Sequence, residues 1–130
     1  MKRKGESSGD PMLGNPKEKA LKKLRKELRS GLYSYLVLSL LEKEGELHGY
    51  AIRKKLEALS DGRLVPSEGA LYDILKGLKK LGLVDDEWAE VGGRPRKYYR
   101  LTDLGREVLG ELRDEIRETV LVIGKVNGGW

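Results

Sequence analysis

The segment from Pro66 to Gly82 constrains the fold more than any other part of this sequence, because it carries the signals of one complete helix. Ser67 is a favourable N-cap, since its hydroxyl can accept a hydrogen bond from a free amide of the first turn. Gly82 suits the left-handed position that ends many helices. Apolar residues recur between these ends at helical spacing and predict a buried face made of Leu71, Ile74, Leu75, Leu78 and Leu81.

The opposite face of this helix is narrow, basic and aromatic. It contains Gly69, Tyr72, Asp73, Lys76 and Lys80. A ridge of this composition can enter the major groove of DNA, where lysine and tyrosine side chains reach bases and phosphates. The alternative is an ordinary solvated helix face, which is the commoner meaning of exposed lysines on an isolated helix.

The charge distribution shows that any nucleic-acid surface must be local. The 130 residues, enough for one domain, carry a formal net charge of +5, but residues 1–30 hold ten basic and four acidic residues, which leaves the other hundred close to neutral. The sequence has no cysteine and one histidine, so a disulfide framework, a thiolate metal site and a cysteine nucleophile are excluded. We expect a cytoplasmic protein, not an enzyme, with no cofactor and no metal.

Three segments are expected before the central helix. Residues 1–16 are rich in basic, Gly, Ser and Pro residues and predict a disordered basic tail. Residues 17–29 predict a helix whose thin apolar stripe, including Leu21, Leu24 and Leu28, must pack on another helix of the same chain or of a second copy. Residues 32–41 are apolar nearly all round and predict a core helix.

A second helix is expected from His48 to Leu59, after a short extended link at Glu46 and Leu47. Ile52, Leu56 and Leu59 should face inward, and Arg53, Lys54 and Lys55 outward. His48 stands beside Gly49 at the helix start, where a capping contact is expected and a metal role is not.

A basic hairpin is predicted after the central helix, with Gly92 and Gly93 as its turn. Its tip carries four cations and no acid in seven residues: Arg94, Arg96, Lys97 and Arg100. One interpretation is an exposed edge that charge protects from aggregation. The other is a wing that lies along a phosphate backbone.

The last predicted element is a helix of about 24 residues, or about 36 Å, that Thr102 caps. Leu104 and Val108 should begin its buried face. From Leu109 onward the apolar spacing alternates between three and four, as in a coiled-coil seam: Leu109, Leu112, Ile116, Thr119, Ile123 and Val126. We expect part of this helix to pack on a partner; a helix that lies across its own domain is the alternative.

The order of these elements predicts a mainly α fold: a winged helix-turn-helix with a two-stranded β wing, an added N-terminal helix and a long C-terminal dimerisation helix. The winged helix-turn-helix domain with its N-terminal extension should cover residues 17–101, and the dimerisation helix residues 102–130. Dimer contacts are expected from Leu21, Leu24, Leu28, Leu109, Leu112, Ile116 and Ile123.

Over residues 32–110 the chain resembles the PadR-like transcriptional regulators. The resemblance rests on the segments His48-Gly49-Tyr50-Ala51-Ile52, Ser67-Glu68-Gly69-Ala70-Leu71-Tyr72 and the run from Gly93 to Arg106 that contains Arg-Lys-Tyr-Tyr-Arg-Leu-Thr. It implies a homodimeric repressor that leaves its promoter when an effector binds; a regulator without a small-molecule effector stays open. A dimer that carries two such ridges about 34 Å apart would require an inverted-repeat operator in double-stranded DNA.

The resemblance also implies site residues. Ser67, Gly69 and Tyr72 would be contacts of the recognition helix, Tyr50 a phosphate contact, and the segment from Arg94 to Lys97 the wing. With the cations predicted from the residues themselves, the expected DNA-binding set is Tyr50, Ser67, Gly69, Tyr72, Lys76, Lys80, Arg94, Arg96 and Lys97. The competing interpretation is a winged-helix module that binds protein and has no specific DNA target.

Overall fold

The computed structural model describes residues 14–129 of the chain. The chain divides into two compact units, and the boundary between them follows Leu32. In the first unit, helix α2 (Pro16–Arg29) begins at Asn15, whose side chain accepts from the Glu18 amide at 2.7 Å. The predicted disordered tail of residues 1–16 therefore ends too late, because Asn15 and Pro16 already belong to the start of α2. Residues 1–13 lie outside the described range.

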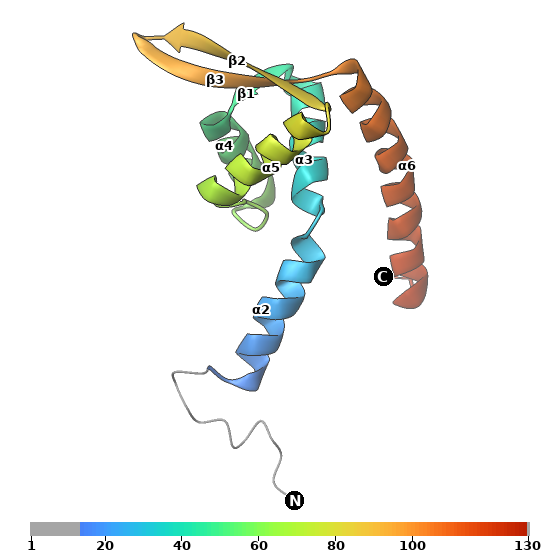
Figure 1. Ribbon diagram of the computed structural model, residues 1–130. Coiled ribbons are helices and arrows are strands. Elements are labelled where there is room, and N and C mark those ends of the chain that lie inside the picture. Colours follow the sequence, from blue (N-terminus) through green and yellow to red (C-terminus); the bar gives the residue numbers. More distant parts are fainter. Residues whose placement is uncertain (1–13, 130) are drawn as a thin grey trace, which may run out of the picture. The chain divides into compact units, whose positions relative to one another are not determined.

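The second unit contains the remaining helices and a small sheet (Figure 1). Their bounds are α3 (Leu32–Glu44), β1 (Glu46–His48), α4 (Gly49–Ser60), α5 (Glu68–Lys80), β2 (Val84–Val91), β3 (Arg94–Leu101) and α6 (Asp103–Val126). This order confirms the predicted winged helix-turn-helix fold, in which α5 occupies the position of the recognition helix and β2 and β3 form the wing.

The sheet has three antiparallel strands in the order β1-β3-β2, one more than predicted. The expected link at Glu46 and Leu47 is strand β1, whose residues pair with β3 from Glu46 opposite Arg100 to His48 opposite Tyr98. A segment of three residues is too short for its sequence to show strand periodicity. Gly92 and Gly93 join β2 to β3, and both have positive φ (59° and 77°), as a two-residue hairpin turn requires.

The core lies between α3, the inner faces of α4 and α5, and the base of the sheet. Val37, Leu38 and Leu41 of α3 are almost fully buried, as predicted for the core helix. Leu71, Leu75 and Leu78 supply the buried face of α5, together with the partly buried Ile74. The predicted apolar stripes pack as expected over the central turns of each helix.

Three leucines at helix ends depart from the prediction. Leu59, Leu81 and Leu104 are 71%, 68% and 48% exposed, although each was expected to face inward. Leu59 and Leu104 lie in the last and first turns of their helices, and Leu81 is the C-cap residue of α5. Periodicity alone extends a buried stripe beyond the turns that the core can cover.

The start of α6 is fixed tightly to the sheet. Thr102 caps the helix by accepting from the Gly105 amide at 3.0 Å, and its hydroxyl donates to the Gly82 carbonyl at 2.7 Å. A Cβ on Gly105 would overlap the carbonyl oxygen of Leu83 and the side chain of Leu101. Only glycine therefore permits this close approach of α6 to the beginning of β2.

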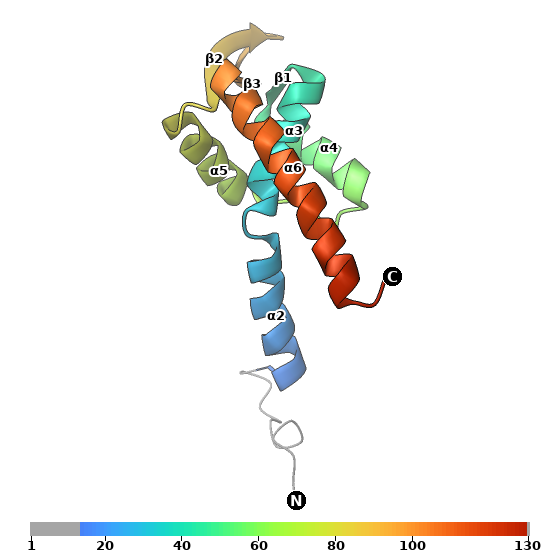
Figure 2. The ribbon, with the colours of Figure 1, turned by 90° about the vertical axis from the view of Figure 1, so that its right-hand side faces the viewer.

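The two halves of α6 have different surroundings. Leu109 is fully buried in the core of its own chain, and Arg113 forms an ion pair of 2.7 Å with Glu42 of α3. Figure 2 shows α6 in front of α3, with its C-terminal half continuing away from the sheet. In that half the apolar side chains are largely exposed: Val120, Leu121, Val122, Ile123 and Val126.

The prediction that Leu109 belongs to an exposed seam is wrong, because the helix is still crossing its own core at this residue. Leu112 and Ile116 are half-buried, and Ile123 is 41% exposed. In α2, Leu21 is half-buried, whereas Leu24 and Leu28 are exposed. The apolar surface open to a partner thus begins beyond Leu109.

Candidate nucleic-acid interface

The outer face of α5 is exposed over its whole length, as its sequence pattern predicts. Ser67 begins the helix by accepting from the Ala70 amide at 3.1 Å, and Gly82 follows its end with a φ of 81°. The Tyr72 side chain is 59% exposed. The predicted ridge residues all lie on this exposed side: Gly69, Tyr72, Asp73, Lys76 and Lys80.

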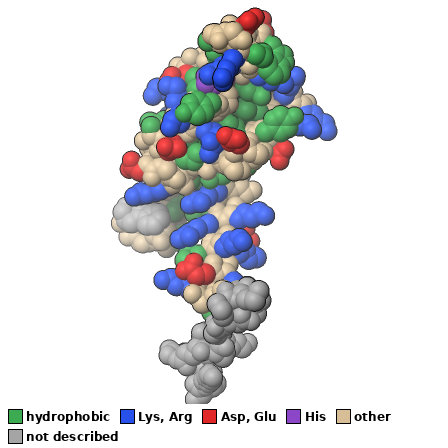
Figure 3. Space-filling view, turned by 90° about the vertical axis from the view of Figure 1, so that its left-hand side faces the viewer, with side chains coloured by type: hydrophobic (Ala, Val, Ile, Leu, Met, Phe, Trp, Pro, Cys, Tyr) green, Lys and Arg blue, Asp and Glu red, His purple; other side chains and the backbone are tan. Residues whose placement is uncertain are grey.

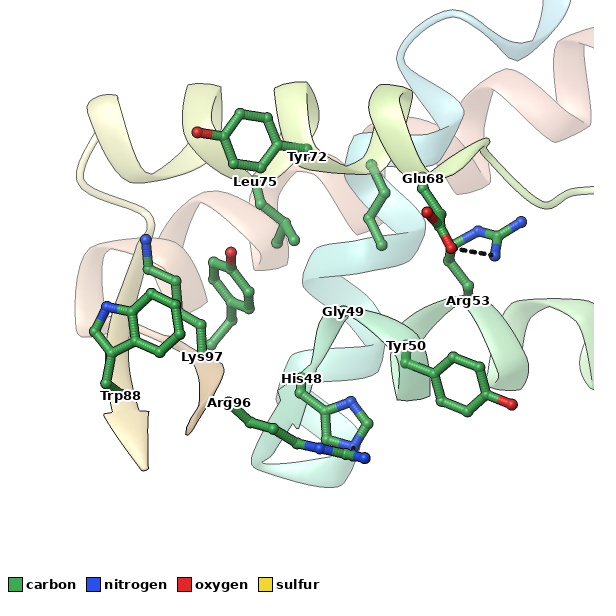
Figure 4. Close-up of a pocket in the computed structure, with 12 residues that line it drawn as sticks. His48, Gly49, Tyr50, Arg53, Glu68, Tyr72, Leu75, Trp88, Arg96 and Lys97 are labelled. Carbon is green, nitrogen blue, oxygen red and sulfur yellow. Dashed lines mark hydrogen bonds and ion pairs between the residues drawn. The ribbon is translucent and has the colours of Figure 1, made fainter. Parts of the chain in front are cut away.

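An open groove of about 490 Å³ separates α4 and α5 from the wing. Aromatic and basic side chains line much of it, among them Tyr50, Tyr72, Trp88, Arg96 and Lys97. In Figure 4, Tyr72 projects from α5, Trp88 and Lys97 from the wing, and His48 and Tyr50 from the start of α4. Figure 3 shows the same mixture of basic and apolar side chains around the single histidine.

Arg53 fixes α4 to the entrance of α5. Its Nε donates to the carbonyl of Pro66 at 3.0 Å, and its Nη1 lies 3.9 Å from a carboxylate oxygen of Glu68. Arg53 was expected to point outward with Lys54 and Lys55, but this half-buried side chain turns toward α5 instead. It therefore orients the recognition helix relative to the helix before it.

Asp86 of β2 holds two lysines from different elements. Its carboxylate lies 2.9 Å from Nζ of Lys79 on α5 and 3.1 Å from Nζ of Lys97 on β3. The hydrogen bond from Lys79, followed by that from Lys97, lowers the pKa of Asp86 against the opposing effect of burial. This carboxylate connects the C-terminal end of the recognition helix to the wing.

The four cations predicted for the wing tip do not share one environment. Lys97 is bound to Asp86, which raises the pKa of its ammonium group, and its Nζ lies 5.6 Å from the centre of the Trp88 ring. Arg100 lies at the base of β3, where Glu87 at 3.0 Å and Glu46 at 3.7 Å bind it. Arg94 stands at the exposed tip, paired in the sheet with Val91.

His48 caps α4, as expected from its position. Its Nδ1 accepts from the Ala51 amide at 3.2 Å, while its Nε2 lies 2.8 Å from Nη1 of Arg96 on β3. The ring also stacks beside Tyr50, with 6.3 Å between ring centres, and meets the edge of Tyr98 at 5.4 Å. Burial, and then the positive charge of Arg96, lower the pKa of His48.

Four of the nine predicted DNA-binding residues line the groove, and Gly69, Lys76, Lys80 and Arg94 are exposed outside its lining. Tyr50, Tyr72, Arg96 and Lys97 line it directly, whereas Ser67 uses its hydroxyl for the helix cap. The sequence did not indicate Arg53, Glu68 or Trp88 as parts of this surface. The single signal for Arg53 was its place on a basic helix face, which does not show that it contacts the next helix.

The comparisons with known proteins agree with this geometry. The sequence profile described as the Transcriptional regulator PadR-like family matches residues 37–111. This chain belongs to the PadR-like family. A PadR family transcriptional regulator from Eggerthella lenta has a similar crystal structure, with a TM-score of 0.70 and 34% identity over 84% of this chain and 93% of that one.

Two further relatives connect the PadR-like fold to regulation. Bacillus subtilis PadR, whose structure was solved with operator DNA, is 29% identical with a TM-score of 0.57 and covers 62% of this chain and 46% of its own. The transcriptional regulator YqjI of Escherichia coli is 31% identical over 81 residues, which is 62% of this chain and 37% of that protein. PadR-like proteins are transcriptional regulators and not enzymes. No helix within residues 14–129 is long and apolar enough to cross a membrane.

Proposed function

We propose that this PadR-like chain is a sequence-specific transcriptional repressor that binds double-stranded DNA as a homodimer. The observation that carries the proposal is the uninterrupted exposure of Gly69, Tyr72, Lys76 and Lys80 along one side of α5, beside a wing with Arg94 at its tip. The likeness to a PadR protein that was solved with operator DNA supports the same function.

In the proposed complex α5 enters the major groove and the wing follows the phosphate backbone. Lys76 donates to guanine acceptors, and Tyr72 packs on a thymine methyl group or donates to a phosphate. Gly69 allows the helix backbone to approach the DNA closely. Arg94 and Arg96 contact phosphates, and Lys97 does so when it leaves Asp86. These contacts position the protein but do not read sequence.

The proposed dimer forms through the exposed C-terminal half of α6, with help from Leu21, Leu24 and Leu28 of α2. A second copy would cover the apolar side chains between Val120 and Val126, which are costly to leave in water. Two recognition helices about 34 Å apart require an inverted repeat with half-sites centred about 10 base pairs apart, or a multiple of that spacing.

The DNA-binding proposal is tested by selecting bound fragments from the native genome and measuring their affinity by fluorescence anisotropy. Tyr72→Ala and Lys76→Ala should each weaken operator binding by about tenfold to a hundredfold and weaken binding to unrelated DNA less. Arg106→Ala, in the first turn of α6 and outside both the groove and the apolar half of that helix, is the matched control and should bind the operator as the wild type does. Equal losses on both kinds of DNA would contradict base reading by α5.

The dimer is tested by Ile123→Glu, with Arg106→Glu as control, since Arg106 is exposed in the first turn of the same helix and lies outside its apolar C-terminal half. A charge buried in the seam has no partner, so Ile123→Glu should give a folded monomer by light scattering and circular dichroism. An unchanged dimer would exclude this part of α6 as the interface. A winged helix that binds only protein would select no DNA fragments and show no salt-dependent shift with DNA.

A further inference from the structure

The contacts of His48 require more acceptors than a neutral imidazole has. Its Nδ1 faces the Ala51 amide at 3.2 Å, and its Nε2 faces the Arg96 guanidinium at 2.8 Å. Both facing groups are donors, whereas a neutral imidazole carries one lone-pair nitrogen and one N–H. One of the two contacts therefore brings two donors together.

The Ala51 contact is the one that keeps the lone pair. The Ala51 amide lies in the first turn of α4, where no earlier helical carbonyl can accept from it, so the His48 cap is its acceptor. Arg96 is exposed, and its long side chain can reorient. Nδ1 is thus the acceptor, and Nε2 carries the proton that points toward the guanidinium.

The ring stays neutral in this arrangement. Burial and the charge of Arg96 lower its pKa, and a proton on Nδ1 would break the cap on Ala51. Within residues 14–129 neither His48 nor Arg96 has a carboxylate among its hydrogen-bond or ion-pair partners. Two donors therefore converge at the mouth of the groove and lack the acceptor that would satisfy both.

We infer that His48 Nε2–H and the Arg96 guanidinium together bind one phosphate group of the DNA backbone. This inference rests on the proposed DNA-binding function and adds His48 to its contacts. A phosphate oxygen between the two nitrogens accepts from both and separates the donors. Figure 4 shows Arg96 extending from the wing to His48 at the start of α4, with Tyr50 beside them and Tyr72 across the same groove.

The positive end of the α4 helix dipole favours an anion at this position as well. The site is made by one residue of α4's cap and one of the wing, so a single phosphate would bridge the two elements. It lies on the α4 side of the groove, away from the outer ridge of α5 that is proposed to read bases. The contact should thus contribute affinity and register without sequence preference.

The test compares His48→Asn with Arg96→Gln in DNA titrations at several salt concentrations. Asparagine preserves a capping oxygen for the Ala51 amide but removes the Nε2–H donor. His48→Asn should weaken binding to operator DNA and to unrelated DNA by a similar factor of about ten. The salt dependence of binding should not change, because a neutral donor displaces no counterion. Arg96→Gln should also lower the slope of log K against log salt by about 0.9.

A methylphosphonate scan of the DNA backbone then identifies the phosphate. When one particular phosphate is replaced by a methylphosphonate, neither His48→Asn nor Arg96→Gln should weaken binding further, because both side chains bind that phosphate. Arg100→Gln is the matched control on the same strand, since Glu87 and Glu46 already hold that guanidinium. If the two substitutions lost their effect at two different phosphates, the inference of one shared phosphate would be overturned.

Nitrogen-15 NMR of the wild-type protein gives a measurement that does not depend on a variant folding. Free protein should show Nδ1 unprotonated and Nε2 protonated, and addition of DNA should shift the Nε2–H resonance. The opposite tautomer, or wild-type affinity of a folded His48→Asn, would overturn the inference while leaving DNA binding intact. Failure of the wild type to bind any DNA would instead contradict the proposed function itself.

Discussion

Helix α5 and strand β3 of the wing both carry more basic than acidic residues, but their cations differ in what they contact. On α5, Lys76 and Lys80 are exposed and take part in no ion pair within the described part of the chain. On β3, Asp86 binds Lys97, and Glu46 and Glu87 bind Arg100. Cross-strand neighbours in a hairpin lie close enough to pair, whereas the outer face of a helix has no adjacent strand. A count of basic residues therefore overstates the charge that the wing can offer to a phosphate.

The largest expected difference is in salt dependence. Lys76→Ala combined with Lys80→Ala should reduce the slope of log K against log salt on unrelated DNA by about 1.8, because on DNA without the operator bases both lysines bind phosphates and each lost phosphate contact removes about 0.9. Fluorescence anisotropy between low and moderate salt measures this slope. A reduction well below one for the double variant would mean that these lysines stay in water in the complex.

A smaller effect is expected where the two regions are connected. Asp86→Asn removes the carboxylate that holds Lys79 of α5 and Lys97 of β3, and should lower the free energy of unfolding by about 1 kcal/mol at neutral pH. Urea denaturation followed by circular dichroism measures the loss. Unchanged stability would show that the groove keeps its shape without this contact.

The wild type and Asp86→Asn can also be compared as a function of pH. The hydrogen bond from Lys79 is the first cause of the lowered pKa of Asp86, so the folded state favours the ionised carboxylate. Its contribution is complete above the ordinary pKa of 3.8 and is lost as the pH falls through the lower value of the folded protein. The stability difference between wild type and Asp86→Asn should thus be constant from pH 7 to 5 and diminish below about pH 4.

The smallest effect is expected at Arg100. Its guanidinium is already bound by Glu87 and Glu46 at the base of the wing, so Arg100→Gln should leave both affinity for DNA and salt dependence close to wild type. Arg94→Gln, which removes an exposed cation at the tip, should lower the slope by about 0.9. Equal losses for the two variants would contradict the difference between free and paired wing cations.

Features that depend on neighbouring residues could be predicted from the sequence. The caps at Ser67 and Thr102, the left-handed Gly82 and the hairpin at Gly92 and Gly93 each follow from local backbone chemistry. The apolar periodicity of α5 and the nearly continuous apolar run of α3 likewise identified their buried turns. The order of these elements was sufficient to predict a winged helix, and the structure confirms it.

Features that depend on contacts between distant segments could not be predicted in this way. The pairing of Glu46 with Arg100 makes β1 a strand, and the ion pair of Lys79 with Asp86 joins α5 to β2. Leu109 was assigned to the seam because spacing does not show how far α6 crosses its own core. Similarly, the sequence indicated a cap at His48 but contained no sign that Arg96 would reach it.

The contacts around Gly105 fix the first turn of α6 to the base of the wing. Thr102 and Gly105 hold the first turn of α6 against Gly82 and Leu83, where α5 ends and β2 begins. A helix of 24 residues has an arm of about 36 Å. Because Thr102 bonds Gly82 and Gly105 packs directly on Leu83, a tilt of α6 would move the C-terminal end of α5 with it. In the proposed dimer, the angle of α6 would therefore also determine the distance between the two α5 helices and their orientation.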